Sequence, residues 1–277
     1  MHVLRLQCED KPGIVAAVAT ALSNAQCNIE ESSQFNDSFS GQFFMRVVFS
    51  ALQENSLGDF KNSFQDVSKR YVMTYHICDL SLPLKTLVMV SQHDHCLYDL
   101  LYRWKNKSLP IDIIGVISNH ETTRNLTQDH GLEFHKIDVS KTDKKEEIIQ
   151  RLYDESGAEL IVLARYMQVL SDSFCKKNAG HIINIHHSFL PGFKGARPYS
   201  QAYERGVKIT GATAHFATAD LDEGPIITQD IVPVDHSYTP QMMQRLGQDT
   251  EAKVLARAVN LFAERRIFIQ DRRTIIL

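Results

Sequence analysis

The sequence predicts an α/β protein in which a small α+β domain precedes a larger domain built on a mostly parallel sheet. Two observations support this prediction. Strand and helix patterns follow the order βαββαβ over residues 1–80, which is enough for a complete small domain. From residue 85 onward, strands and helices alternate, and right-handed crossovers then favour a parallel sheet with helices on both faces. We expect residues 81–84 to link the first domain to the second, which covers residues 85–277.

The first domain is expected to contain four strands and two helices. Asp10 precedes Pro12 and Gly13 in a turn, and it is expected to cap the first helix. Two alternating segments flank a polar turn at residues 36–38, which predicts a hairpin. The expected strands cover residues 2–8, 27–35, 41–49 and 71–78, and the expected helices cover residues 12–24 and 57–69.

The second domain is expected to begin with five strands separated by helices, of which the helix over residues 141–153 has the clearest pattern. Two further strands follow, and then a long helix over residues 239–265, which we expect to be interrupted at Gly247. A short strand over residues 267–270 closes the chain. The expected strands before it cover residues 86–90, 111–117, 133–139, 159–163, 182–186, 209–218 and 226–234.

Composition narrows the class of protein. The 277 residues carry a formal charge of −3 with no run of Lys or Arg longer than two, which argues against nucleic-acid or anionic membrane partners. The five cysteines are scattered and never form a C-x-x-C pair, so neither a disulfide framework nor a zinc knuckle is expected. No apolar run approaches ~18 residues, and the first residues do not resemble a signal peptide. We expect a cytoplasmic enzyme.

Polar residues gather between residues 181 and 225, where a buried α/β framework would favour apolar ones. Asn184, His186 and Ser188 share one face of an expected strand, near the carboxyl end where open α/β sheets bind ligands. His215 lies on the next expected strand, over residues 209–218, and Asp222 lies in the acidic turn after that strand. An amide, two imidazoles and a carboxylate are therefore expected to converge.

These residue types suit acyl transfer without a covalent intermediate. The amide of Asn184 could stabilise an oxyanion, while His186 and Asp222 share proton transfer. Ser188 lacks a Gly-x-Ser-x-Gly elbow, so attack by water or by a substrate amine is favoured. The residues alone leave a structural role open, because a single histidine on a strand is more often only hydrogen-bonded.

Two further groups have plain interpretations. His93, His95 and Cys96 could indicate a metal, but no spaced partner is visible, and a solvated helix start is favoured. Asp220 and Glu223 are typical turn acids. We therefore expect no metal.

Four ordered motifs resemble the signature of the formyltransferases that use 10-formyltetrahydrofolate. The motifs begin at Asn184, Gly195, Thr213 and Leu221, and the resemblance covers roughly residues 85–277. It implies a Rossmann-like formyltransferase domain, with Asn184, His186 and Asp222 as the catalytic residues. The resemblance also implies supporting roles for His215, His187 and Ser188, and substrate contacts at Arg165, Met167, Gln168, Val169, Leu170, Gly195 and Asp220. Among these contacts, Met167, Val169 and Leu170 would line an apolar slot for the pterin.

Residues 1–80 resemble an ACT domain, with a ferredoxin-like fold. The resemblance implies an amino-acid effector and association of the chain into a homo-oligomer. Asp10, Gly13 and Asn28 are the candidate effector contacts, and a domain that only joins subunits is the alternative.

The acceptor of the formyl group is the remaining question. Glycinamide-ribonucleotide formyltransferases carry a glycine-rich phosphate loop after the first strand of this fold, but residues 90–97 here contain no glycine and include Asp94. The arrangement of domains and His187 resemble the formyltetrahydrofolate deformylases. This implies hydrolysis of 10-formyltetrahydrofolate to formate and tetrahydrofolate with no prosthetic group, in one-carbon metabolism and the supply of formate for purine synthesis. The alternatives are an N-formyltransferase acting on a non-phosphorylated amine, and a non-catalytic ACT regulator.

Overall fold

The computed structural model describes residues 1–138, 144–192 and 198–277. The chain divides into two compact units. Unit 1 comprises Met1–Leu82, Glu264–Phe268 and Ile276–Leu277, and unit 2 comprises Pro83–Ala263 and Ile269–Ile275. The sequence predicts one continuous second domain after residue 84, whereas two short segments near the carboxyl terminus pack with unit 1.

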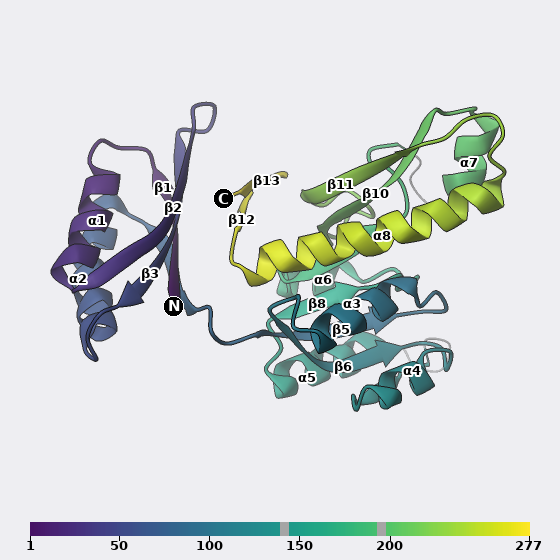
Figure 1. The fold of residues 1–277 in the computed structure, drawn as a ribbon, viewed down its shortest axis with the longest axis horizontal. Coiled ribbons are helices and arrows are strands. Elements are labelled where there is room, and N and C mark those ends of the chain that lie inside the picture. The colour runs from purple at the N-terminus through teal and green to yellow at the C-terminus, as the bar shows by residue number, and fades with distance from the viewer. Residues whose placement is uncertain (139–143, 193–197) are drawn as a thin grey trace. The chain divides into compact units, whose positions relative to one another are not determined.

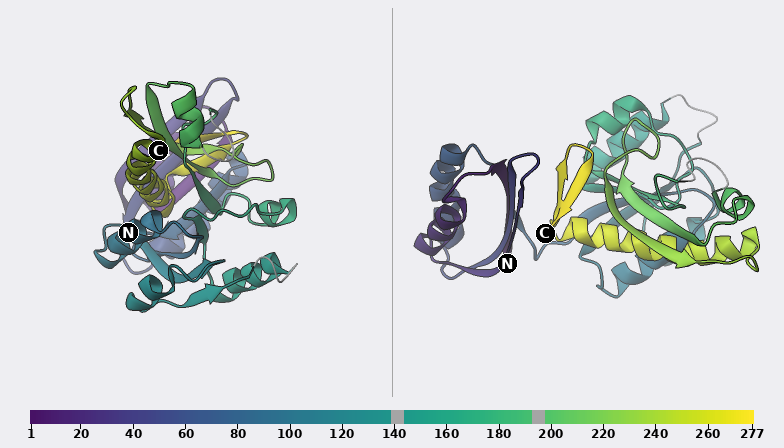
Figure 2. Two further views of the ribbon diagram at one scale, coloured as in Figure 1. Left: turned by 90° about the vertical axis from the view of Figure 1, so that its right-hand side faces the viewer. Right: turned by 90° about the horizontal axis from the view of Figure 1, so that it is seen from above.

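Unit 1 is an antiparallel sheet with two helices on one face, and its strand order is β2-β3-β1-β4 (Figure 2). Helices α1 and α2 bury a cluster of apolar side chains that includes Phe49, Phe60 and Phe64 against the sheet. The strands are β1 (His2–Glu9), β2 (Cys27–Asp37), β3 (Gln42–Ala51) and β4 (Thr74–Asp79), and the helices are α1 (Ile14–Asn24) and α2 (Ser56–Tyr71).

The turn before α1 differs from its prediction. Gly13, with φ 91°, is the N-cap residue, and no side chain caps the helix. The carboxylate of Asp10 instead accepts a hydrogen bond from Nδ2 of Asn36 at 2.5 Å. Asp10 is thus tied to the end of the β2 strand, and the prediction of a capping role was wrong.

The second face of the unit 1 sheet contacts the segment Glu264–Phe268. The rings of Phe44 and Phe268 lie 5.6 Å apart, and Nε of Arg46 donates to the carbonyl of Glu264 at 3.1 Å. Phe44 is fully buried and Arg46 is 6% exposed. Strand period explains this, because alternate side chains of β3 face the helices and the others face this segment.

Unit 2 is built on a mostly parallel sheet, as predicted. Within the described residues its strand order is β11-β10-β9-β8-β5-β6-β7, with β10 and β11 antiparallel to their neighbours (Figure 1). The strands are β5 (Leu84–Val90), β6 (Ile111–Ser118), β7 (Phe134–Lys136), β8 (Leu160–Leu163), β9 (Ile182–His186), β10 (Ile209–Phe216) and β11 (Ile226–Pro233). The chain order reverses between β5 and β8, which is where open α/β sheets form ligand crevices.

The helices of unit 2 are α3 (His95–Lys105), α4 (Arg124–Asp129), α5 (Lys145–Ser156), α6 (Asp172–Lys177), α7 (Pro198–Glu204) and α8 (Pro240–Ala263). Helix α8 contacts α3, β9 and β10, and α5 and α6 pack in a separate apolar cluster that includes Ile149 and Phe174. A hairpin of β12 (Ile267–Gln270) and β13 (Arg273–Ile276) ends the chain. Strand β12 was predicted, and β13 was not.

None of the helices in the described ranges is long and apolar enough to cross a membrane.

Helix α8 is continuous, so the predicted interruption at Gly247 was wrong. A Cβ atom at Gly247 would lie 1.8 Å from the hydroxyl of Tyr199. The glycine therefore provides room for the ring of Tyr199, and tertiary packing maintains the helix through it.

Candidate active site

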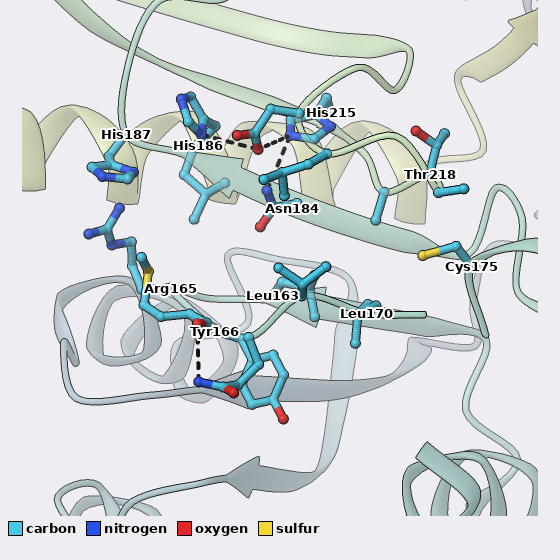
Figure 3. A pocket seen from close by; sticks show the side chains of 18 residues that line it. Leu163, Arg165, Tyr166, Leu170, Cys175, Asn184, His186, His187, His215 and Thr218 are labelled. Atoms are coloured by element: carbon cyan, nitrogen blue, oxygen red, sulfur yellow. Dashed lines mark hydrogen bonds and ion pairs between the residues drawn. The ribbon is translucent and has the colours of Figure 1, made fainter. Parts of the chain in front are cut away.

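The candidate site is a cavity of about 250 Å³ in unit 2, beside the carboxyl ends of β8 and β9. Its wall consists of the segment that follows β8, the end of β9 and the turn that joins β10 to β11 (Figure 3). Leu163 ends β8, and Asn184 and His186 lie on β9. The cavity therefore lies where the strand order predicts a ligand site.

His186 and Asp222 meet in this cavity. The Nδ1 atom of His186 lies 3.2 Å from Oδ1 of Asp222, and the two side chains are 4% and 6% exposed. Nε2 of His215 lies 3.7 Å from the same carboxylate oxygen. Burial alone would raise the pKa of Asp222, but the hydrogen bond from His186 brings that pKa below its usual value. Asp222 is therefore an ionised carboxylate at neutral pH.

The turn between β10 and β11 brings Asp222 to this position. Asp222 itself has φ 58°, a left-handed conformation that aspartate tolerates better than most residues. A Cβ atom at Gly224 would lie 1.8 Å from the carbonyl oxygen of Phe216, so only glycine permits this close approach. The amide of Phe216 donates to the carbonyl of Pro225 at 3.0 Å and closes the turn.

Asn184 is held by His215. Nδ1 of His215 donates to the carbonyl of Phe216 at 2.9 Å, which leaves Nε2 to accept from Nδ2 of Asn184 at 3.1 Å. An amide nitrogen carries two hydrogens, so the second remains available to a substrate carbonyl. The sequence prediction that these four polar residues converge is borne out geometrically.

His187 also lines the cavity, and its ring centroid lies 5.2 Å from that of His186. Burial, together with the nearby charge of Arg165, lowers the pKa of His187 to about 3. The imidazole is therefore neutral at physiological pH.

The segment after β8 forms the apolar wall of the cavity. Met167 and Val169 are 52% and 65% exposed, and Leu170 is 9% exposed. All three line the cavity together with Gln168 and Arg165. Apolar side chains exposed in a cavity are typical of a surface that a flat ligand covers.

Ser91 fixes the backbone of this wall. The amide of Met167 donates to Oγ of Ser91 at 3.0 Å, and the amide of Ser91 donates to the carbonyl of Arg165 at 3.2 Å. The hydroxyl of Ser91 in turn donates to Asn119 at 2.7 Å. The loop that carries the apolar side chains is thereby tied to the end of β5.

Other predicted site residues lie elsewhere. Ser188 is buried, and its hydroxyl donates to the carbonyl of Gly192 at 2.9 Å, so it shapes the loop and does not line the cavity. Asp220 is exposed in the turn, where its carbonyl accepts from the hydroxyl of Thr218 at 3.1 Å. Gly195 lies outside the described residues.

The candidate effector residues belong to unit 1. Asp10 and Gly13 line a surface hollow beside α1, together with Phe43. Asn28 is not part of that hollow, and its Nδ2 donates to Glu30 at 3.1 Å.

Sequence reasoning missed a buried polar cluster behind the cavity. Glu251 on α8 is 1% exposed; its Oε1 accepts from the hydroxyl of Tyr199 at 2.6 Å, and its Oε2 lies 2.8 Å from Nε2 of His95. Burial would raise the pKa of Glu251, but the hydrogen bond from His95 and the charge of Arg165 bring that pKa below its ordinary value. The sequence did contain a signal for this cluster. Glu251 is four residues before Leu255, so it is a charged residue on the apolar, buried face of α8.

His95, Cys96 and Glu251 place potential metal ligands within 4.8 Å of one another. The structure favours a satisfied polar cluster over a cation site. Both oxygens of Glu251 already have partners, Nε of Arg165 lies 3.4 Å from Oε2, and burial raises the pKa of the Cys96 thiol. A neutral thiol and a neighbouring guanidinium both oppose binding of a metal ion.

Two family models match the chain. One is described as Formyl transferase and covers residues 84–259, and the other is described as ACT domain and covers residues 2–56.

Full-length relatives share both parts. The formyltetrahydrofolate deformylase of Corynebacterium sp. (strain P-1) is 47% identical over 100% of this chain and 98% of its own length. The protein of the same name from Bacillus subtilis is 40% identical over 99% and 92%.

Solved structures agree with the sequence relatives. A formyltetrahydrofolate deformylase from Burkholderia mallei has a TM-score of 0.93 at 46% identity, and covers 100% of this chain and 99% of its own. A glycinamide ribonucleotide transformylase from Symbiobacterium toebii has a TM-score of 0.67 at 30% identity, and covers 70% of this chain and 94% of its own. The deformylase structure thus matches the whole chain, and the transformylase structure matches a part of it.

Proposed function

The chain belongs to the formyltetrahydrofolate deformylases, and we propose that Asn184, His186 and Asp222 catalyse its reaction, the hydrolysis of 10-formyltetrahydrofolate to formate and tetrahydrofolate. The observation that supports these roles most directly is the 3.2 Å contact between His186 and Asp222 in a cavity that Asn184 also lines. The folate takes part in this reaction as the substrate, and the proposed mechanism uses no prosthetic group.

In the proposed mechanism, His186 and Asp222 activate a water molecule that attacks the formyl carbon. The new bond joins the water oxygen to that carbon, and the proton passes to the pair. Asp222 holds the imidazole through Nδ1, which directs the other ring nitrogen, Nε2, to the reaction. General acid–base catalysis of this kind contributes roughly 10²–10⁴ in rate.

The attack produces a tetrahedral oxyanion, which Asn184 and protonated His186 stabilise. The amide of Asn184 is positioned by His215, so its donor needs no reorganisation during the reaction. The bond from carbon to N10 then breaks, and N10 takes the proton that His186 holds. The formic acid formed loses its remaining proton to solvent, so formate and tetrahydrofolate are the products.

We propose that the pterin packs against Met167, Val169 and Leu170, and that the backbone of residues 164–170 pairs with its polar edge. The exposure of Met167 and Val169 within the cavity supports this position, because a folate ring would cover both. Arg165 and Gln168 line the same wall.

Water is the proposed acceptor because the loop before α3 lacks glycine and carries an acid. Residues 91–95 contain no glycine, and exposed Asp94 is the N-cap of α3. A phosphorylated amine would meet the negative charge of Asp94 where helix N-termini ordinarily attract anions.

A formate assay without any added amine tests the proposed function. Purified enzyme and 10-formyltetrahydrofolate should yield formate and tetrahydrofolate in equal amounts. Formate release that requires an added amine would instead indicate a transferase, and an unchanged substrate would indicate a non-catalytic protein.

For unit 1, we propose binding of an amino-acid effector and association into a homo-oligomer. The hollow lined by Asp10 and Gly13 supports the first proposal, because a carboxylate there could meet an ammonium group. Formate release measured against added glycine and methionine, in the wild type and in Asp10→Asn, tests it; superimposable curves would favour a purely structural unit. Sedimentation equilibrium tests the oligomer.

We place the enzyme in the cytoplasm, where it would take part in one-carbon metabolism and supply formate for purine synthesis. All five cysteines are described, and all are free, which suits a reducing compartment.

A further inference from the structure

Arg165 brings a fixed positive charge to the cavity wall. Among the described residues that line the cavity, Arg165 is the one permanent cation and Asp222 is the one carboxylate. The neighbouring imidazole of His187 is neutral, as its lowered pKa shows, so it does not share this role. An anion in the cavity would therefore be attracted to Arg165 and repelled by Asp222.

The guanidinium of Arg165 has donors that no group of the described residues fills. Its side chain is 8% exposed, and Nε and Nη1 are buried with no hydrogen-bond partner among the described residues. Nε lies 3.4 Å from Glu251, but the two oxygens of Glu251 are engaged by Tyr199 and His95. Glu251 thus balances the charge of Arg165 and leaves two of its donors unsatisfied, which is rare for a buried guanidinium.

The backbone of Arg165 supports a functional role for this side chain. Its φ is 64°, a left-handed conformation in which glycine would be unstrained and arginine is not. Strain of this kind gathers at functional sites, where the side chain contributes more than its conformation costs.

We propose that Arg165 forms the binding site for the carboxylate of formate, the product of the reaction. This inference rests on the proposed function, because hydrolysis converts a neutral formamide into an anion beside the ionised Asp222. A guanidinium fork matches a carboxylate, and two N–H groups can bind both oxygens together. Figure 3 shows Arg165 pointing toward His187, which follows His186 in the chain, so the product would move a short way along this wall.

The variant Arg165→Lys tests the subsite. Lysine keeps the charge that faces Glu251 but loses the planar fork. Two constants are measured: the inhibition constant of formate during turnover, and the dissociation constant of sodium formate by calorimetric titration of the enzyme without folate. In Arg165→Lys both constants should rise at least tenfold. They should stay at the wild-type values in Arg103→Lys, whose arginine pairs with Asp99 on the surface of α3.

Unchanged constants in Arg165→Lys would overturn the proposal, even if the melting temperature falls, because Arg165 would then be a structural partner of Glu251. If Arg165→Lys fails to fold, the double variant Arg165→Met and Glu251→Gln removes both charges together. Its two constants for formate should also rise at least tenfold, and unchanged constants would overturn the proposal. A wild-type enzyme that releases formate but binds none would overturn the subsite and leave the proposed function intact. If the wild type releases no formate, the proposed function fails, and the titration still decides whether Arg165 binds the anion.

Discussion

The carboxylate of Asp222 lies between two imidazoles, with Oδ1 3.2 Å from Nδ1 of His186 and 3.7 Å from Nε2 of His215. The first contact orients the proposed catalytic base. His215 plays a different part, because its Nδ1 is held by the carbonyl of Phe216 and its Nε2 accepts from Asn184. One aspartate and one histidine thus align both the base and the oxyanion donor.

Replacement of Asp222 by asparagine should lower kcat for formate release by at least ~10², because the amide cannot share the proton that His186 takes from water. The variant should remain folded, since the side-chain volume is unchanged. Asp129→Asn is the control, because Asp129 is an exposed acid at the end of α4. Near-normal turnover in Asp222→Asn would remove Asp222 from the mechanism.

Asn184→Ala should lose roughly 10²–10³ in kcat, which corresponds to about 2.7–4 kcal/mol for one oxyanion donor. KM for the folate should change much less, because the amide acts on the transition state. Steady-state kinetics separates the two constants, and Asn106→Ala, an exposed change at the end of α3, is the control. An effect confined to KM would assign Asn184 to substrate binding alone.

His187 should make the folded enzyme sensitive to acid. Its pKa is about 3 in the folded state and near 6.5 when unfolded, so the unfolded state binds more protons between these values. The contribution of the neutral His187 ring to the free energy of unfolding is then fully present above pH 6.5. It decreases as the pH falls, by up to about 1.4 kcal/mol per pH unit. Between pH 7 and pH 5, titration of His187 should lower the free energy of unfolding by about 2 kcal/mol.

Urea unfolding of His187→Gln at both pH values measures this effect, because the variant should lose about 2 kcal/mol less than the wild type. The exposed His236→Gln serves as the control. Parallel losses in His187→Gln and the wild type would show that the ring of His187 does not carry the titration.

Gly247→Ala should destabilise the enzyme by about 1–3 kcal/mol, because the new methyl group would displace Tyr199 from Glu251. Gly58→Ala in α2 is the matched control, since nothing lies within 4 Å of its Cβ position. At Gly58, alanine should leave the free energy of unfolding unchanged or raise it by about 0.5–1 kcal/mol. Thermal unfolding compares the two variants, and equal effects would mean that the space at Gly247 is not needed for Tyr199.

Much of the fold could be predicted from periodicity. Strand β9 was predicted at its observed bounds, and the parallel order of unit 2 followed from the alternation of strands and helices. The predicted ends and interruptions of helices were wrong where tertiary contacts override local conformational preference. Gly247 stays helical because the ring of Tyr199 packs against it, and Asp10 bonds to Asn36 and leaves α1 uncapped.

Asn184 and His186 stood out in the sequence because each breaks the pattern of an apolar strand. Asp222 lies in an acidic turn, and its proposed role came from the resemblance to the formyltransferases. Glu251 also breaks a pattern, but its importance depends on Tyr199 and His95, which are far from it in sequence. The unsatisfied donors of Arg165 could not be predicted, because they are a property of three-dimensional packing.

The segment Glu264–Phe268 has a practical consequence for how this protein can be divided. Because Phe268 and the carbonyl of Glu264 complete the sheet face that bears Phe44 and Arg46, a recombinant fragment ending at residue 82 would expose apolar surface to water. Such a fragment should aggregate or require a fusion that restores the missing segment. Unit 1 is thus assembled from segments that are far apart in the sequence, and no single cut of the chain releases it whole.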